Sequence, residues 1–249
     1  MNEIDLIRTI EEISMNAWPA LQTVHADGWV LGFGGGYTRR ANSVHPLYPP
    51  VGELDECIRF CESMYRSQGL PTTFKLTKAV HPPDLDTILA GRGYSTDAPT
   101  GVQVMELAGR TGAIDPAVSL SETLTSEWLA AYCRMSSVPD GNRVTLERIL
   151  RSVLPAHRFA AVVVDGQIVA CGMGVLQSGF IGFYDIVTDP AFRRQGHAYR
   201  MIESLLAWAR ERGARRAYLQ VMLANAPALA LYARLGFHEL YRYWYRARA

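Results

Sequence analysis

The residues best placed to do chemistry lie in one stretch, residues 186–198, whose sequence is IVTDPAFRRQGHA. The stretch joins a run that predicts a strand to a run that predicts a helix. Such a junction directs backbone N–H groups and the positive end of a helix dipole at one spot. Arg193 and Arg194 add cationic donors, and Gly196 lets the backbone approach a phosphate closely. These features predict a diphosphate-binding loop, although the spacing is neither the Walker pattern nor the Gly-x-Gly-x-x-Gly pattern.

Two motifs in the second half of the chain resemble those of the GNAT N-acetyltransferase superfamily. Arg193-x-x-Gly196-x-Ala198 is similar to the family's acyl-CoA signature, Arg/Gln-x-x-Gly-x-Gly/Ala. Residues 225–237, with sequence NAPALALYARLGF, are similar to its Asn-x-x-Ala…Tyr-x-x-x-Gly-Phe region. The resemblance covers residues 117–249 and reaches the first half only through a degenerate repeat. It implies an N-acetyltransferase that uses acetyl-CoA as cosubstrate and needs no metal.

The resemblance also implies roles for individual residues. The backbone of residues 186–188 would pair with the pantetheine arm like an added strand, which requires this strand to splay from the next one. The Arg193 side chain and the loop amides would hold the diphosphate, and Asn225 would contact the pantetheine. Tyr232 would protonate the departing thiolate; the alternative is a core aromatic packed under the Gly236-Phe237 pair. The expected cofactor-binding set is Ile186, Val187, Thr188, Arg193, Arg194, Gln195, Gly196, His197, Ala198, Asn225 and Tyr232.

The general base is not fixed by a motif. Asp185 precedes the expected pantetheine strand and lies in an apolar run, an environment that tunes a carboxyl for proton transfer. Strand alternation places its side chain on the face opposite Tyr184 and Ile186. A structural hydrogen bond is the alternative role for Asp185, and a water relay is another route for the proton. His238 and Glu239 are weaker candidates.

The elements that would position these residues occur twice, in the same order. Sliding the sequence by 144 residues places Gly52 on Gly196 and Gly69 on Gly213. The expected strands are residues 20–25, 29–33, 37–44, 72–77, 101–107, 158–164, 167–176, 180–188, 217–222 and 237–246. The expected helices are residues 4–16, 52–68, 84–90, 125–135, 143–154, 198–212 and 226–235. The order predicts an α/β protein with tandem GNAT-like domains, residues 1–110 and 117–249, each a mixed, mostly antiparallel twisted sheet flanked by helices.

The first half lacks the chemistry of the second. Its equivalent loop, residues 46–54, has prolines where the second half has Arg193 and Arg194, and proline offers no N–H. Glu53 would repel a phosphate, and Leu89 stands at the position of Tyr232. We therefore expect an N-terminal domain that has lost CoA binding. The polar run at residues 37–42 either lines an acceptor cleft or faces solvent.

Composition excludes several other classes of protein. With 249 residues, 49% of them hydrophobic and 20% charged, the chain can bury a core and is not disordered. It has no apolar run long enough for a bilayer span and no signal peptide, and its four cysteines are too few for a disulfide framework, so we expect a cytoplasmic protein without a membrane partner. Residues 190–249 contain 11 Arg and 3 Glu, which suggests a localised anionic partner. The Arg-rich aromatic tail fits a twisted terminal strand better than a nucleic-acid groove.

The leading functional hypothesis is acetyl transfer to the primary amine of a small molecule by direct attack. A protein lysine or N-terminal acetyltransferase is one alternative, and a non-catalytic acyl-CoA-binding regulator is another. We expect a monomer or a homodimer.

Overall fold

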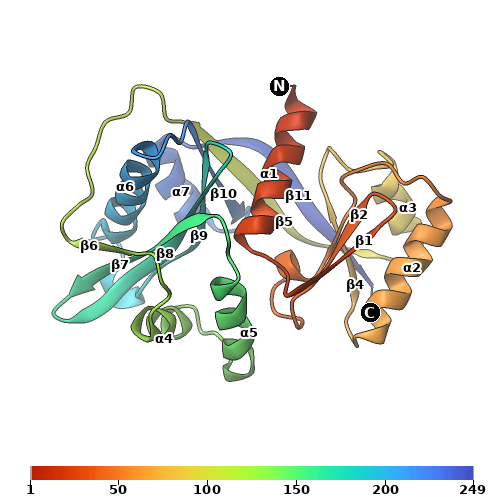
Figure 1. Cartoon of the computed structure of the whole chain (residues 1–249), viewed down its shortest axis with the longest axis horizontal. Helices are drawn as coiled ribbons and strands as arrows, with labels where there is room; N and C mark the ends of the chain where they lie inside the picture. The colour runs from red at the N-terminus through yellow and green to blue at the C-terminus, as the bar shows by residue number, and fades with distance from the viewer. Residues whose placement is uncertain (1, 249) are drawn as a thin grey trace. The chain divides into compact units, whose positions relative to one another are not determined.

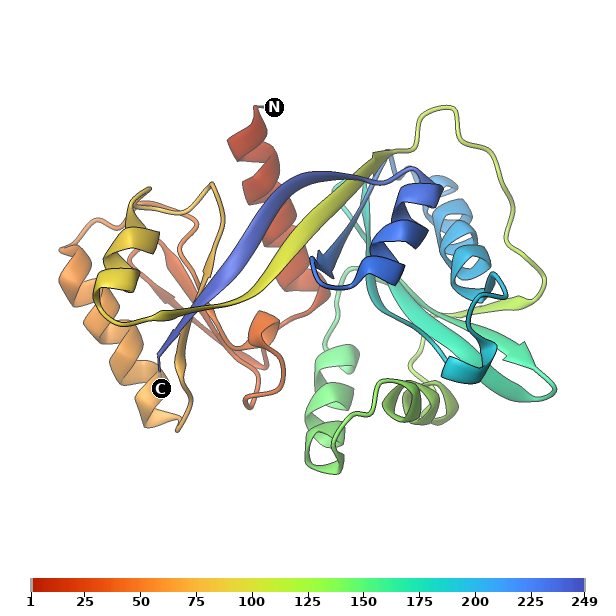
Figure 2. The ribbon, with the colours of Figure 1, turned by 180° about the vertical axis from the view of Figure 1, so that it is seen from behind.

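The computed structural model describes residues 2–248, and the chain divides into two compact units (Figures 1 and 2). The first unit comprises the residues up to Gly101 together with those from Tyr241 onward, and the second comprises Val102–Leu240. The boundary expected between residues 110 and 117 therefore lies inside the second unit. Among the described residues, no helix is long and apolar enough to cross a membrane.

The first unit contains a sheet with the strand order β1-β2-β3-β4-β11. Antiparallel pairing joins β1 to β2 to β3, and β3 pairs in parallel with β4. Its elements are α1 (Glu3–Ala17), β1 (Gln22–Ala26), β2 (Trp29–Phe33), a 3-10 turn (Arg39–Ala41), β3 (Val44–His45), α2 (Leu54–Ser67), β4 (Thr72–Leu76), α3 (Leu85–Gly91) and the start of β5 (Ser95–Glu106). Its apolar core includes Trp29, Tyr65 and Phe74, all essentially inaccessible to solvent.

The second unit contains a sheet with the order β5-β10-β9-β8-β7-β6. Its elements are β6 (Val118–Ser121), α4 (Ser126–Met135), α5 (Asp140–Arg151), β7 (Ala156–Val164), β8 (Gln167–Gln177), β9 (Phe180–Thr188), a 3-10 turn (Pro190–Phe192), α6 (His197–Arg210), β10 (Arg216–Met222), α7 (Ala226–Leu235) and the start of β11 (His238–Arg248). Helix α6 covers one face of β7, β8 and β9, while α4 packs against β8 and β9 from the other face (Figures 1 and 2).

Both units follow the same path. Three antiparallel strands lead through a helix to a strand that pairs in parallel with the third one: β3, α2 and β4 in the first unit, and β9, α6 and β10 in the second. Strands β5 and β11 each cross the division between the two units. Strand β5 begins in the first unit and ends in the second, and β11 begins in the second and ends in the first. Strand β11 ends in the first unit, where Trp244 pairs with Leu76 of β4.

A buried ion pair fixes that terminal segment in the first unit. Lys75 of β4 lies 2.6 Å from Glu11 of α1, and both side chains are at most 2% exposed. The Tyr241 hydroxyl donates to the other oxygen of Glu11 at 2.6 Å, and the Lys75 ammonium lies 4.0 Å from the centre of the Tyr243 ring. Both charges are therefore compensated inside the core, as burial requires.

Two sequence expectations about elements are wrong. The strand expected at residues 37–44 is a 3-10 turn followed by the two residues of β3. Asn42 causes the difference, because its amide oxygen accepts from the N–H groups of Gly34 and Gly36 while its amide nitrogen donates to the carbonyls of residues 37 and 38. Such side-chain bonds replace a strand ladder. Strand β6, at Val118–Ser121, was not expected at all.

Candidate active site

The central feature of the second unit is an opening between β9 and β10. These strands pair in parallel from Phe180 opposite Arg216 to Phe183 opposite Leu219, and the pairing ends there. Strand β9 continues to Thr188 and keeps its antiparallel partners on β8, whereas β10 continues to Met222. The splay that the sequence analysis required is thus present, and residues 186–188 border it.

A β-bulge in β9 lies at the opening. Tyr184 pairs with Met173 and Val187 pairs with Cys171, so β9 has one residue more than β8 between these pairs. Asp185 adopts a φ of 57°, a left-handed conformation that Asp tolerates better than most residues. Phe183 and Ile186 both pack into the cluster under α6. Tyr184 and Asp185 therefore lie together on the opposite side, and the alternation expected between them is wrong.

The Asp185 carboxylate faces α4. The Tyr132 hydroxyl, from α4, donates to Asp185 Oδ1 at 3.0 Å. Cys171 of β8 is buried on the same side; burial raises the pKa of its thiol, and the charge of Asp185 raises it further. Neither partner was expected from the sequence, because Tyr132 belongs to an apolar helix stripe and no spacing links it to residue 185. The positive φ of Asp185 has no sequence signal beyond the residue type.

The loop after β9 leads directly into α6. Its 3-10 turn is capped by Asp189, whose carboxylate accepts from the Ala191 N–H at 3.1 Å and forms an ion pair with Arg134. Arg194 and Gly196 both adopt left-handed conformations, with φ of 63° and 83°. The helix begins at residue 197, so the N–H groups of its first turn have no partner within the helix. The loop thus has the backbone geometry of an anion site.

The side chains of this loop divide into two groups. Those of Arg194 and Gln195 are exposed, and the Arg193 Nε donates to the Thr188 carbonyl at 3.4 Å. His197 instead is only 5% exposed, and its Nδ1 accepts from Arg200 at 2.8 Å. Burial, followed by the charge of Arg200, lowers the pKa of His197. The imidazole is therefore neutral at pH 7 and is buried beside the loop. If the loop binds a diphosphate, His197 would donate its backbone N–H to it rather than a ring N–H.

Helix α7 begins where β10 ends. Asn225 is its N-cap, and the side-chain oxygen accepts from the Ala228 N–H at 3.3 Å. Tyr232 is buried, and desolvation raises its pKa to about 12. Its ring packs against Phe237, with ring centroids 6.1 Å apart, in the cluster that also contains Phe183 and Leu219. Phe183 and Leu219 form the final β9–β10 pair, and the Phe183 ring also packs against Phe237, with centroids 6.1 Å apart. The weaker base candidates, His238 and Glu239, are exposed.

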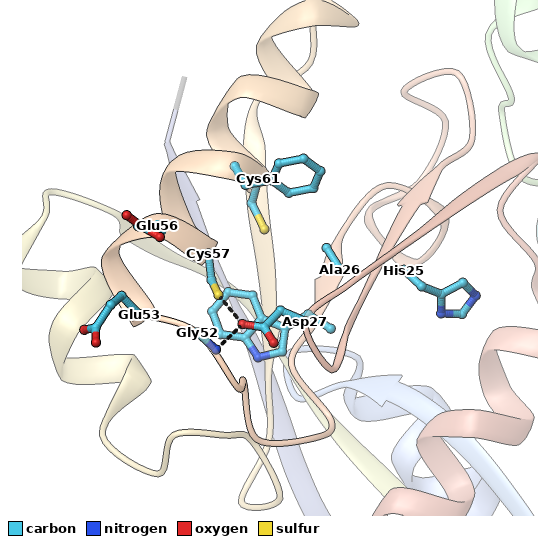
Figure 3. Close-up of a pocket in the computed structure, with 10 residues that line it drawn as sticks. His25, Ala26, Asp27, Gly52, Glu53, Glu56, Cys57 and Cys61 are labelled. Atoms are coloured by element: carbon cyan, nitrogen blue, oxygen red, sulfur yellow. Dashed lines mark hydrogen bonds between the residues drawn. The ribbon is translucent and has the colours of Figure 1, made fainter.

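The matching loop of the first unit is occupied by a side chain of the protein itself. Asp27, in the turn between β1 and β2, accepts from the Val51 N–H at 2.7 Å. It also accepts from the Gly52 N–H at 2.8 Å and from the Cys57 thiol at 2.9 Å (Figure 3). These hydrogen bonds lower the pKa of Asp27. A cavity of about 360 Å³ lies beside it, with Glu53 and Glu56 also lining it.

Hairpin length explains the difference between the units. Strands β1 and β2 have five residues each, whereas β7 and β8 have nine and eleven. Both hairpins turn at an Asp-Gly pair with positive φ at both residues, Asp27-Gly28 and Asp165-Gly166. The shorter hairpin brings its aspartate onto the amides before α2. A carboxylate thus accepts from the amides of residues 51 and 52, which correspond to residues 195 and 196 of the second unit.

The comparisons with known proteins agree with this fold. The protein is a GNAT-fold N-acetyltransferase, as the sequence motifs indicated. A family model described as "Probable histone acetyltransferase Rv0428c C-terminal" matches residues 5–246, and the chain belongs to that family. The uncharacterized N-acetyltransferase YobR of Bacillus subtilis is 27% identical over 98% of this chain and 100% of its own length.

Solved structures show the same architecture. A GCN5-related N-acetyltransferase from Kribbella flavida has a TM-score of 0.70 at 15% identity and covers 96% of this chain and 94% of its own. A tandem GNAT protein from the clavulanic acid biosynthesis pathway has a TM-score of 0.61 at 14% identity and covers 96% and 87%. The tandem α/β fold is therefore confirmed. The role of the chain as an acyltransferase rests on the family match and the YobR similarity instead.

Shorter similarities name two kinds of acceptor for other proteins. The ribosomal protein bS18 alanine N-acetyltransferase of Escherichia coli is 39% identical over 22% of this chain and 38% of its own length. An aminoglycoside N(6')-acetyltransferase of Serratia marcescens is 32% identical over 46% of this chain and 86% of its own length.

Within residues 2–248, no group of three or more His, Cys, Asp or Glu side chains is arranged to hold a metal ion.

Proposed function

We propose that the second unit transfers the acetyl group of acetyl-CoA to the primary amine of a small molecule. The observation that supports this most directly is the opening between β9 and β10, which begins after the Phe183–Leu219 pair. Residues 186–188 border the opening and offer backbone groups to the amides of a pantetheine arm. The loop before α6 follows immediately in the sequence.

The diphosphate would be held by the loop amides and the Arg193 side chain. Arg194 and Gly196 have left-handed conformations, which would let the loop N–H groups face an anion, and the N-terminus of α6 would add its dipole. Asn225 would reach the pantetheine through its amide nitrogen, since its oxygen caps α7.

The chemistry would be a direct attack by the amine on the thioester carbonyl. Asp185 would take a proton from the amine, and a backbone N–H near Val187 or Thr188 would stabilise the oxyanion. Tyr232 would donate its proton to the sulfur as the carbon–sulfur bond breaks. The raised pKa keeps the Tyr232 hydroxyl protonated before the reaction, and the phenolate formed would recover a proton from solvent.

The first unit would bind no second CoA. Asp27 already occupies the amides of Val51 and Gly52, and Leu89 stands at the position of Tyr232. A protein amine is the second candidate acceptor, favoured by the similarity to the bS18 alanine acetyltransferase. The similarity to an aminoglycoside acetyltransferase favours a small amine.

The test is a thiol-release assay with acetyl-CoA and a panel of polyamines, amino acids, aminoglycosides and peptides with a free lysine or N-terminal amine. We expect turnover with a small amine, reduced by at least tenfold in Tyr232→Phe at an unchanged acetyl-CoA affinity. Turnover with the peptides alone would move the acceptor to proteins. Binding of acetyl-CoA without turnover of any amine would favour the regulatory alternative, and unchanged turnover in Tyr232→Phe would remove that residue from the acid role.

A further inference from the structure

The hydrogen bond between Tyr132 and Asp185 joins a helix to the irregular part of a strand. The bulge gives Asp185 a φ of 57° and turns its carboxylate toward α4, the face opposite α6. The loop proposed to hold the diphosphate precedes α6, so an acceptor amine would approach the opening from the side of α4. On that side two carboxylates flank residues 186–188: Asp189 is paired with Arg134 of α4, and Asp185 accepts from Tyr132.

Tyr132 is itself held rigidly. Its ring stacks on Trp128, with centroids 5.5 Å apart and planes 10° from parallel. The Trp128 indole N–H donates to the Ala160 carbonyl of β7 at 2.9 Å, and the Thr125 side chain caps the helix by accepting from the Trp128 N–H at 3.1 Å. The phenol is thus fixed to the sheet through a second aromatic ring, and its hydroxyl is a donor of defined position.

Other titratable groups also lie near Asp185 on this side of the sheet. Burial raises the pKa of the Cys171 thiol, so that side chain is neutral at pH 7. Arg134 of α4 forms its ion pair with Asp189 and donates to the Ile168 carbonyl at 3.0 Å. Cys133, the neighbour of Tyr132 on α4, also has a raised pKa through burial. Tyr132 is therefore the hydroxyl that donates to Asp185, beside two thiols that stay neutral.

We infer that Tyr132 is a positioning residue for the Asp185 carboxylate, and that this pair receives an acceptor that arrives as an ammonium ion at the α4 face. The catalytic role of this pair rests on the proposed function, whereas the hydrogen bond between Tyr132 and Asp185 does not. The ammonium nitrogen gives one proton to Asp185, which passes it to solvent, and the neutral amine then attacks the acetyl carbon. Asp185 takes the second proton as the nitrogen becomes an amide nitrogen, the carbon–sulfur bond breaks, and the thiolate takes the proton of Tyr232. Tyr132 keeps its own proton throughout. A hydrogen bond to the charged form keeps the carboxylate ionised and ready to accept that proton.

The test is a carbon-13 NMR titration of the Asp185 carboxyl in the native chain and in Tyr132→Phe. The Asp185 signal is identified as the one that disappears in Asp185→Asn. Loss of a donor to the ionised form should move the titration midpoint up by about one pH unit. With 3-fluorotyrosine at position 132, a stronger donor of nearly the same shape, the midpoint should move down. Where an amine substrate is in hand, the acidic limb of kcat/KM for the amine should move with the midpoint, and the KM for acetyl-CoA should stay within about twofold.

Tyr65→Phe is the matched control, because it also removes a buried hydroxyl, one that donates to the Gly32 carbonyl at 2.9 Å in the first unit. It should lower thermal stability without moving the Asp185 midpoint. A midpoint that stays fixed in both position-132 variants would overturn the inference, whatever the activity. Absence of amine acetylation by the native chain would instead refute the proposed function, and the titration would still decide the role of Tyr132.

Discussion

Two substitutions at Gly196 separate backbone strain from charge at the proposed diphosphate site. Gly196 has a φ of 83°, and a Cβ added to it would meet no atom within 4 Å. Gly196→Ala and Gly196→Glu should therefore incur the same left-handed strain, about 1–2 kcal/mol of folding stability. Only the second places a carboxylate at the start of α6. The difference between the two variants in acetyl-CoA affinity then measures charge repulsion alone.

The expected magnitude follows from Coulomb's law. A unit charge about 4 Å from another costs about 1 kcal/mol in water, and a diphosphate presents roughly two such charges. Gly196→Glu should thus bind acetyl-CoA about 2 kcal/mol more weakly than Gly196→Ala, or roughly 30-fold in Kd. Salt screens exposed charges, so the gap should narrow as ionic strength rises.

Isothermal titration of acetyl-CoA into the three chains is the assay. The native chain should bind one equivalent, and Gly196→Ala should stay within a few fold of it. Equal affinity in the two variants would refute a diphosphate at Gly196. Two equivalents per chain would overturn the claim that the first unit binds no CoA, and no binding by the native chain would remove acetyl-CoA from the proposal.

Three further predictions concern stability. Gly182→Ala would place a Cβ 2.5 Å from the Tyr218 ring and should lower the free energy of unfolding, measured in urea melts, by about 1–3 kcal/mol. Gly141→Ala is the control: a Cβ at residue 141 would meet open space, so the free energy of unfolding should stay equal or rise slightly. Lys75→Met, which strands a buried carboxylate, should cost about 3–5 kcal/mol by the same measurement, and a loss under 1 kcal/mol would show that the ion pair is not needed. Because the folded pKa of Asp27 is lowered, its stabilisation is present above the unfolded pKa of about 3.9 and is lost as pH falls through the folded value. Asp27→Asn should accordingly flatten the acid end of the stability–pH curve, and an unchanged curve would contradict this.

Periodicity predicted most of the elements correctly. The strands at residues 29–33 and 180–188 and the helix at residues 226–235 lie where their patterns placed them, because each has strong apolar spacing and a glycine or polar stop. The splay could also be expected, through the resemblance. The strand at residues 37–44 failed because Asn42 satisfies four backbone groups with its side chain, a local competition that propensity does not report.

The contacts around the site were harder to foresee. Asp185 was a candidate from its position in the sequence alone. The face of the sheet on which its side chain lies depends on its positive φ, because a one-residue bulge reverses the alternation of side chains along the rest of the strand. Tyr132 lies 53 residues away in sequence, and Asp27 lies 25 residues from Gly52. Such pairings depend on hairpin length and helix placement, and no local pattern in a single sequence reports them.

The division of the chain has a consequence for its synthesis. The residues from Tyr241 onward belong to the first unit, yet the ribosome makes them after the whole of the second unit. Until they emerge, β4 lacks its antiparallel neighbour and Glu11 lacks the Tyr241 hydroxyl. The first unit therefore stays incomplete, with the edge of β4 unpaired, while some 140 later residues are translated. A gene fragment ending at residue 110 would leave the first unit permanently in that state, and expression of the halves as separate products should yield an aggregation-prone N-terminal piece.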